Sequence, residues 1–154
     1  EYHGETLQIN PYKDIVIVEG IHALGLMQGL DNVIKVYIEP NDILIDGNGV
    51  LTGQRLRLFR RIVRDRKHRG MSPEDTIKKS VSVDRGERLY IAPYKKNADY
   101  YIDSLIHYEL FIHAEELGMF KEVSEILRFE EEQHIPSIGA EDIPKGSLLE
   151  EFYI

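Results

Sequence analysis

The run Asp14-Ile-Val-Ile-Val18 constrains the fold of this chain more than any other feature of its sequence. A continuous β-branched stretch is typical of a strand that is covered on both faces, as in a parallel sheet. Two other short runs, at 33–38 and 99–102, are also strand-like, and helical patterns separate the three. Strands that alternate with helices favour an α/β fold with a mainly parallel sheet flanked by helices. Because three strands are few for such a sheet, we expect it to be incomplete in this chain.

Turn and cap residues mark the boundaries of the other expected elements. The segment 42–52 predicts a hairpin, because its Asp-Gly-Asn-Gly turn contains residues that accept positive φ. Gly70 is expected to end a helix over 54–67, and Ser72 to begin another, which breaks at 90–93. We further expect a helix or helical turn at 21–30, amphipathic helices at 105–117 and 120–132, a loop at 136–144 and a short helix at 147–154.

The composition, 42% hydrophobic and 30% charged, is ordinary for a globular protein. No apolar run approaches the roughly 20 residues that a membrane-spanning helix needs. The absence of Cys excludes disulfides and thiolate metal sites, and no G-x-S-x-G motif indicates a nucleophilic serine. We therefore expect a cytoplasmic protein that has no membrane partner.

Positive charge is concentrated in one segment of an acidic chain. Residues 55–69 contain seven Arg and one Lys against a single acid, Asp65, whereas the whole chain has a formal net charge of -8. Such a compact basic segment argues against binding of duplex nucleic acid, which usually needs a wide basic face. A nucleotide phosphate tail is the ligand that we prefer for it.

A helix would bring several of these basic residues onto one face. Arg57, Arg61, Arg64 and His68 are spaced at i, i+4, i+7 and i+11. Guanidinium groups match the oxygens of phosphate in their planar geometry and stay charged at any working pH. Because like charges at this spacing repel, we expect an anion to compensate them. Either a polyphosphate or a set of internal acids would do so.

Glu19 is a candidate ligand for a metal ion. It follows the expected strand at 14–18, and ligands of open α/β sheets gather at the carboxyl ends of strands. In P-loop proteins an acid at such a place holds Mg²⁺, directly or through water. Glu19 could instead cap the next helical segment or lie in solvent.

The order of these motifs resembles the phosphoribulokinase/uridine kinase family. Residues 16–24, Val-Ile-Val-Glu-Gly-Ile-His-Ala-Leu, are similar to the strand-end motif of uridine kinases. Residues 60–65, Arg-Arg-Ile-Val-Arg-Asp, followed by Arg69-Gly70, resemble the lid helix of the family, and 87–99 resemble its "E…YI.P….AD" segment. Segments 104–110 and 143–152 also have counterparts, most similar to those of bacterial uridine-kinase-like nucleoside kinases.

The resemblance implies a fold, a reaction and a set of site residues. We expect residues 1–154 to be one domain, the C-terminal portion of a P-loop kinase fold, with a helical lid at about 53–70 and a helical C-terminal segment at about 104–154. The implied reaction transfers the γ-phosphate of ATP to a nucleoside sugar hydroxyl, with Mg²⁺ as cofactor and nucleotides and nucleosides as binding partners. The oligomeric state is left open, a homo-oligomer included.

The implied roles fall on four residues. Glu19 matches the acid near Mg²⁺, and Arg64 and Arg69 match lid arginines that contact the phosphates of ATP. Arg61 matches an arginine that reaches toward the nucleoside. Met71 stands where many uridine-cytidine kinases have another substrate arginine, so the acceptor is left open.

The phosphate-binding loop itself is not in the sequence. No G-x-x-x-x-G-K-[ST] motif occurs, and the chain begins at Glu1 without Met. We expect the P-loop and the acidic base to lie upstream and this chain to be inactive by itself. The alternative is a non-catalytic remnant of the kinase fold that binds a nucleotide or a partner.

Overall fold

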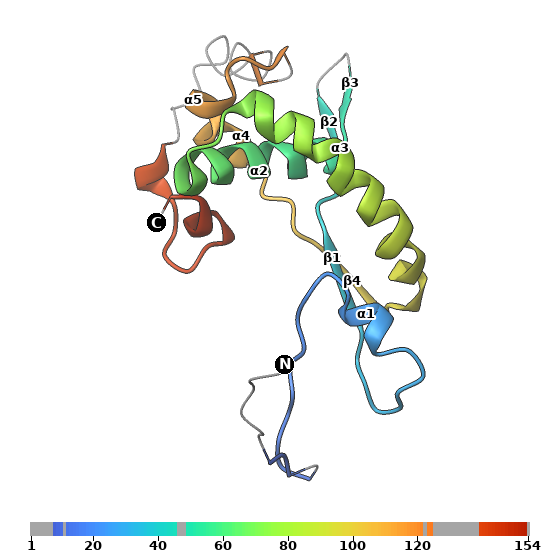
Figure 1. The fold of residues 1–154 in the computed structure, drawn as a ribbon. Coiled ribbons are helices and arrows are strands. Elements are labelled where there is room, and N and C mark those ends of the chain that lie inside the picture. Colours follow the sequence, from blue (N-terminus) through green and yellow to red (C-terminus); the bar gives the residue numbers. More distant parts are fainter. Residues whose placement is uncertain (1–7, 11, 46–48, 122, 125–138, 154) are drawn as a thin grey trace.

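The fold is mixed α/β, as the sequence predicts (Figure 1). The computed structural model describes residues 8–10, 12–45, 49–121, 123, 124 and 139–153. Strand β1 (Val36–Glu39) pairs in parallel with β4 (Tyr100–Asp103), with Val36 opposite Tyr100 and Glu39 opposite Asp103. Strands β2 (Ile43–Ile45) and β3 (Gly49–Leu51) form the expected antiparallel hairpin. The predictions of the strands at 33–38 and 99–102 and of the hairpin are therefore confirmed.

Two long helices, α2 (Gly53–Arg69) and α3 (Pro73–Tyr90), follow the hairpin. Gly70 ends α2 with a φ of 61°, a left-handed conformation that glycine adopts without steric cost. Ser72 caps the start of α3, because its side-chain oxygen accepts a hydrogen bond from the backbone N–H of Asp75. Both boundaries are where the sequence predicts them.

Short helices complete the described chain. They are α1 (Ala23–Leu26), the 3₁₀ turn η1 (Ala92–Asn97), α4 (Glu109–Ile112), α5 (Ala114–Leu117), and the 3₁₀ turns η2 (Ala140–Asp142) and η3 (Leu148–Phe152). The single helix expected over 105–117 is instead divided at His113. The backbone there leaves the helical region, with φ -87° and ψ 2°, and the ring is completely buried against Phe152 and Tyr153.

The hydrophobic core lies between α2, the short helices α4 and α5, and η3. Its buried members on α2 are Leu56, Phe59, Ile62 and Val63, which recur at helical spacing. They pack with buried residues from the other elements, including Leu110, Ile112, Leu117, Leu149 and Phe152. Helix α2 is therefore the central element of the core, and its other faces are left for polar contacts.

The prediction of a buried strand at 14–18 is wrong. These residues form no strand in the structure, and Ile15 and Ile17 are 92% and 88% exposed. A parallel strand needs a neighbour for its backbone hydrogen bonds, and in the described part of the chain β1 pairs only with β4. The β-branched composition alone cannot supply that neighbour.

Most of the predicted helix over 120–132 and the first three residues of the loop over 136–144 lie outside the described residues. The described part of that loop contains the 3₁₀ turn η2. The short helix expected at 147–154 is confirmed as the 3₁₀ turn η3. The helical turn expected at 21–30 is confirmed as the four residues of α1.

Candidate functional site

Internal acids pair with several basic residues of α2. Arg57 pairs with Glu87 of α3, and Arg66 Nη1 lies 2.6 Å from Glu116 Oε2 of α5. Lys67 Nζ lies 3.6 Å from the same carboxylate of Glu116. From the sequence, either a polyphosphate or internal acids could compensate the positive charge of this helix. For Arg57, Arg66 and Lys67 the structure shows internal acids, so these residues have a structural role.

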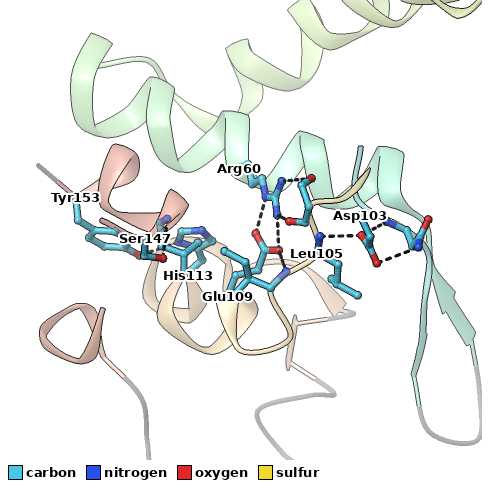
Figure 2. A network of polar contacts seen from close by, with 11 residues as sticks. Arg60, Asp103, Leu105, Glu109, His113, Ser147 and Tyr153 are labelled. Carbon is cyan, nitrogen blue, oxygen red and sulfur yellow. Dashed lines mark hydrogen bonds and ion pairs between the residues drawn. The ribbon is translucent and has the colours of Figure 1, made fainter. Parts of the chain in front are cut away.

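Arg60 makes the most deeply buried of these ion pairs (Figure 2). Its Nε and Nη2 atoms donate to the two carboxylate oxygens of Glu109 at 2.6 and 2.7 Å, a bidentate arrangement. Nη2 also donates to the backbone oxygen of Ser104 at 2.6 Å. Since the Glu109 side chain is fully buried and that of Arg60 is 12% exposed, this pair connects α2 to the start of α4 in a dry environment.

The arginines with implied phosphate roles lie around a different acid, Asp65. Arg69 Nη1 donates to Asp65 Oδ1 at 2.8 Å, and Arg64 Nε lies 3.9 Å from the same oxygen. The Arg69 side chain is 58% exposed and that of Arg64 is 36% exposed, so both guanidinium groups reach solvent. The structure therefore brings Arg64 and Arg69 together at the C-terminal end of α2.

Arg61 is half-buried between α2 and α3. Burial holds the pKa of its guanidinium below the ordinary value, and the neighbouring charges of Arg57 and Arg64 act in the same direction. Asp84 and Asp65 act in the opposite direction. Arginine nevertheless stays protonated at any working pH, so Arg61 adds a fixed positive charge to the same face as Arg64.

Glu19 is exposed and lies in the irregular segment that precedes α1. Figure 1 shows this part of the chain beside β1 and β4, at the other end of the molecule from the last turn of α2. Among the described residues, no ion pair or hydrogen bond joins Glu19 to Arg61, Arg64 or Arg69. The structure does not bring the predicted metal ligand and the arginines together.

The described residues offer no ready-made metal centre. They include no group of three or more His, Cys, Asp or Glu side chains that could hold a metal ion. Mg²⁺ commonly takes only one or two carboxylates and completes its shell with water and substrate phosphates, so the chemistry of the Glu19 carboxylate is suitable. Its distance from the arginines, however, gives no joint site for Mg²⁺ and phosphate, and we derive no step through the metal.

A cleft of about 940 Å³ lies at the carboxyl end of β1. Its lining includes charged and polar residues from the end of β1 and the loop after it, from α2 and from α3: Glu39, Asn41, Arg57, Asp84, Arg85 and Arg88. Lys95 pairs with Glu39 at one side, and this hydrogen bond raises the pKa of the Lys95 ammonium. Carboxyl ends of strands are where open α/β sheets bind ligands. Sequence reasoning did not find this cleft, because its residues come from three elements.

The first turn of α2 is fixed against this cleft. Gly53 approaches the loop so closely that a Cβ atom there would lie 2.0 Å from the backbone oxygen of Pro40. Its N–H donates to Asp42 Oδ1 at 2.7 Å. Only glycine allows this approach, and α2 therefore begins at a defined position relative to the end of β1.

A buried histidine connects the C-terminal turn to the core (Figure 2). Tyr153 Oη donates to the Ile112 backbone oxygen at 2.8 Å, so its hydrogen is already used. The His113 Nδ1 atom, 2.8 Å from the same hydroxyl, must then be the donor. Burial lowers the pKa of His113 to about 4, and the positive charges of Arg60 and Lys67 add to this effect.

Comparison with known proteins assigns the chain to a family. The profile of the phosphoribulokinase / uridine kinase family matches residues 5–110, which include β1 to β4, α2 and α3. The chain belongs to the phosphoribulokinase/uridine kinase family. The resemblance of the strand-end, lid-helix and 87–99 motifs is thereby confirmed, whereas the roles of single residues stay predictions.

The curated relatives of this family member match only in part. A uridine kinase of Bacillus pumilus is 39% identical over 97 residues, 62% of this chain and 40% of the relative. A uridine kinase of Staphylococcus haemolyticus is 37% identical over 98 residues, 62% of this chain and 41% of the relative. The chain thus spans about two fifths of the length of these relatives. No solved structure matches it.

No helix in the described part of the chain has the length and apolar character needed to cross a membrane.

Asp65 is the residue of this site whose importance the sequence reasoning missed. It is only 3% exposed and contacts two of the predicted phosphate arginines. A signal was present, because Asp65 is the single acid among the eight basic residues of 55–69. A lone acid in so basic a segment indicates a carboxylate with specific partners.

Proposed function

We propose that this chain is part of an ATP-dependent nucleoside kinase and that the last turns of α2 bind the phosphates. The proposal is supported by the family match and by the pair of solvent-reaching guanidinium groups of Arg64 and Arg69. The complete protein would transfer the γ-phosphate of ATP to a nucleoside sugar hydroxyl. The relatives are named uridine kinases. Uridine kinases are ATP-dependent phosphotransferases.

The proposed roles follow from charge and placement. Arg64 and Arg69 would bind phosphate oxygens and neutralise the charge that develops on the transferring group. Arg61 would add its fixed charge toward the nucleoside side of the same face. Residues 53–70 would act as the lid. Residues 104–154 would form the helical C-terminal segment that supports this lid.

A second candidate is a non-catalytic remnant that binds a nucleotide or a partner without turnover. The internal pairing of Arg57, Arg60 and Arg66 favours it, since much of the basic helix has a structural task that needs no phosphate. Binding of nucleotide in the absence of turnover would identify this case.

A calorimetric titration of this chain with ATP tests whether the arginines bind phosphate. The Arg64→Ala variant should bind at least about 10-fold more weakly, because a charge-assisted contact to phosphate is lost. Lys78→Ala is the matched control, since it removes one positive charge from a side chain that is 79% exposed. Equal loss in both variants would show a general charge effect instead of a site.

Phosphorylation of a nucleoside panel by the full-length natural protein tests the reaction. Transfer to at least one nucleoside supports the kinase, with turnover reduced in Arg64→Ala far more than stability. ATP binding without transfer to any nucleoside would refute the kinase and leave the remnant. A loss in Arg64→Ala that is mainly one of stability would refute the phosphate role.

A further inference from the structure

The buried carboxylate of Asp65 lies among all three arginines with proposed roles. It contacts Arg69 directly, lies 3.9 Å from Arg64 Nε, and acts electrostatically on Arg61. Its second oxygen, Oδ2, accepts a hydrogen bond from Thr76 Oγ1 of α3 at 3.3 Å. A carboxylate removed from water is costly unless its oxygens are paired, and here both oxygens have partners.

The contacts leave the arginines restrained but open. Arg69 is held through one of its nitrogens, while its side chain stays 58% exposed. Arg64 Nε is buried and makes no hydrogen bond within the described part of the chain, although the side chain is 36% exposed. Arg69 is thus held by a hydrogen bond, whereas Arg64 is restrained by charge, because its Nε lies 3.9 Å from Asp65 Oδ1 and its Nη1 lies 3.9 Å from Glu151 Oε1.

Such restraint changes the free energy of anion binding. A free arginine side chain has about 2 kcal/mol of rotamer entropy to lose when it is ordered. A side chain that is already restrained loses less of it when the anion binds, which is the general advantage of preorganisation. The same carboxylate reduces the mutual repulsion of three like charges on one helix.

We propose that Asp65 is a positioning residue, which holds Arg64 and Arg69 in the orientation that binds a polyphosphate. This inference rests on the proposed function of the arginines. Thr76 fixes the other oxygen of Asp65 and so connects the arrangement to α3. Asp65 itself, as an anion, does not touch the phosphate.

The test is the affinity of this chain for inorganic tripolyphosphate, measured by calorimetry in wild type and Asp65→Asn. Loss of a negative charge near an anion site should tighten binding if Asp65 acts only through its charge or only in packing. Loss of positioning should weaken binding, by about 10-fold, although the net charge becomes more favourable. The two readings therefore predict opposite signs.

Three further variants complete the experiment. Asp75→Asn makes the same change of charge at a side chain that is 60% exposed, and should leave the affinity within about twofold. Asp65→Glu, which restores the carboxylate, should recover part of the affinity. Thr76→Val removes the hydroxyl without a change of charge and should weaken binding about threefold. It keeps the test valid if Asp65→Asn fails to fold.

The results separate this inference from the function on which it rests. Weak binding in Asp65→Asn or Thr76→Val, with normal circular dichroism, supports the positioning role. Unchanged or tighter binding in both overturns it, while loss of binding in Arg64→Ala and Arg69→Ala would leave the proposed function intact. If those two arginine variants bind as wild type does, the proposed phosphate site is wrong and the inference fails with it.

Discussion

The ion pair between Arg60 and Glu109 is expected to be the most stability-critical polar contact of the described core. Replacing Glu109 with Gln keeps the shape but removes the charge that compensates Arg60. Two charge-assisted hydrogen bonds, at 2.6 and 2.7 Å, are then lost or weakened. At about 1.5–3 kcal/mol each they are worth about 3–6 kcal/mol together. Removing one partner of a buried pair costs about 3–5 kcal/mol, which is the loss that we expect.

Urea unfolding followed by far-UV circular dichroism measures this loss. A loss of this size is a large fraction of the roughly 5–15 kcal/mol by which domains are stable. Lys78→Gln is the control, because Lys78 and Asp75 form an exposed pair at 3.9 Å that should be worth less than about 1 kcal/mol. The m-value should stay unchanged, since the surface that unfolding exposes is the same.

The double variant Arg60→Met/Glu109→Leu provides the sharper result. It leaves no unpaired buried charge, so it should be less destabilised than the sum of the two single variants Arg60→Met and Glu109→Leu. The neutral groups that lose a partner are the two Ser104 oxygens, which accepted from Arg60, and the Ile106 N–H, which donated to Glu109. Each of them costs about 1–3 kcal/mol if it stays buried and unpaired. A double variant that loses as much as the sum of both single variants would refute the reasoning.

Further predictions concern the buried histidine and two glycines. Since the folded-state pKa of His113 is lowered from 6.5 to about 4, its stabilising effect is present above pH 6.5 and is lost as the pH falls toward 4. Wild type should therefore lose about 2 kcal/mol between pH 7.5 and 5.0 that His113→Gln does not lose, measured by urea unfolding at both pH values. Gly53→Ala should destabilise by about 1–3 kcal/mol or more in thermal unfolding, because its Cβ would collide with Pro40. Gly86→Ala, within α3 and with open space around it, should instead stabilise by about 0.5–1 kcal/mol.

Elements whose signals are local could be predicted from the sequence. The hairpin, the end of α2 at Gly70 and the start of α3 at Ser72 depend on residues within a few positions of each boundary. The β-branched composition of 14–18 is an equally clear signal for a strand. A strand, however, also needs a neighbouring strand to which its backbone can hydrogen-bond. The division of the helix at His113 likewise depends on Phe152 and Tyr153, about 40 residues away.

The candidate site shows the same limit. Arg64 and Arg69 could be selected by spacing and by resemblance, and the structure brings them together at Asp65. Which arginines are engaged by internal acids could not be predicted, because Glu87 and Glu109 are 30 and 49 residues from their partners. The roles of Glu19, Arg61, Arg64 and Arg69 all stay predictions.

The bond between Gly53 N and Asp42 Oδ1 has a consequence for how this part of the chain tolerates change in length. It joins the two residues that flank the β2–β3 hairpin. The two ends of the hairpin are therefore held together. Insertions or deletions within it leave the start of α2 where it is relative to β1, provided that the buried Leu51 is kept. A fused domain or an epitope tag inserted in the hairpin should therefore leave the start of α2 undisturbed.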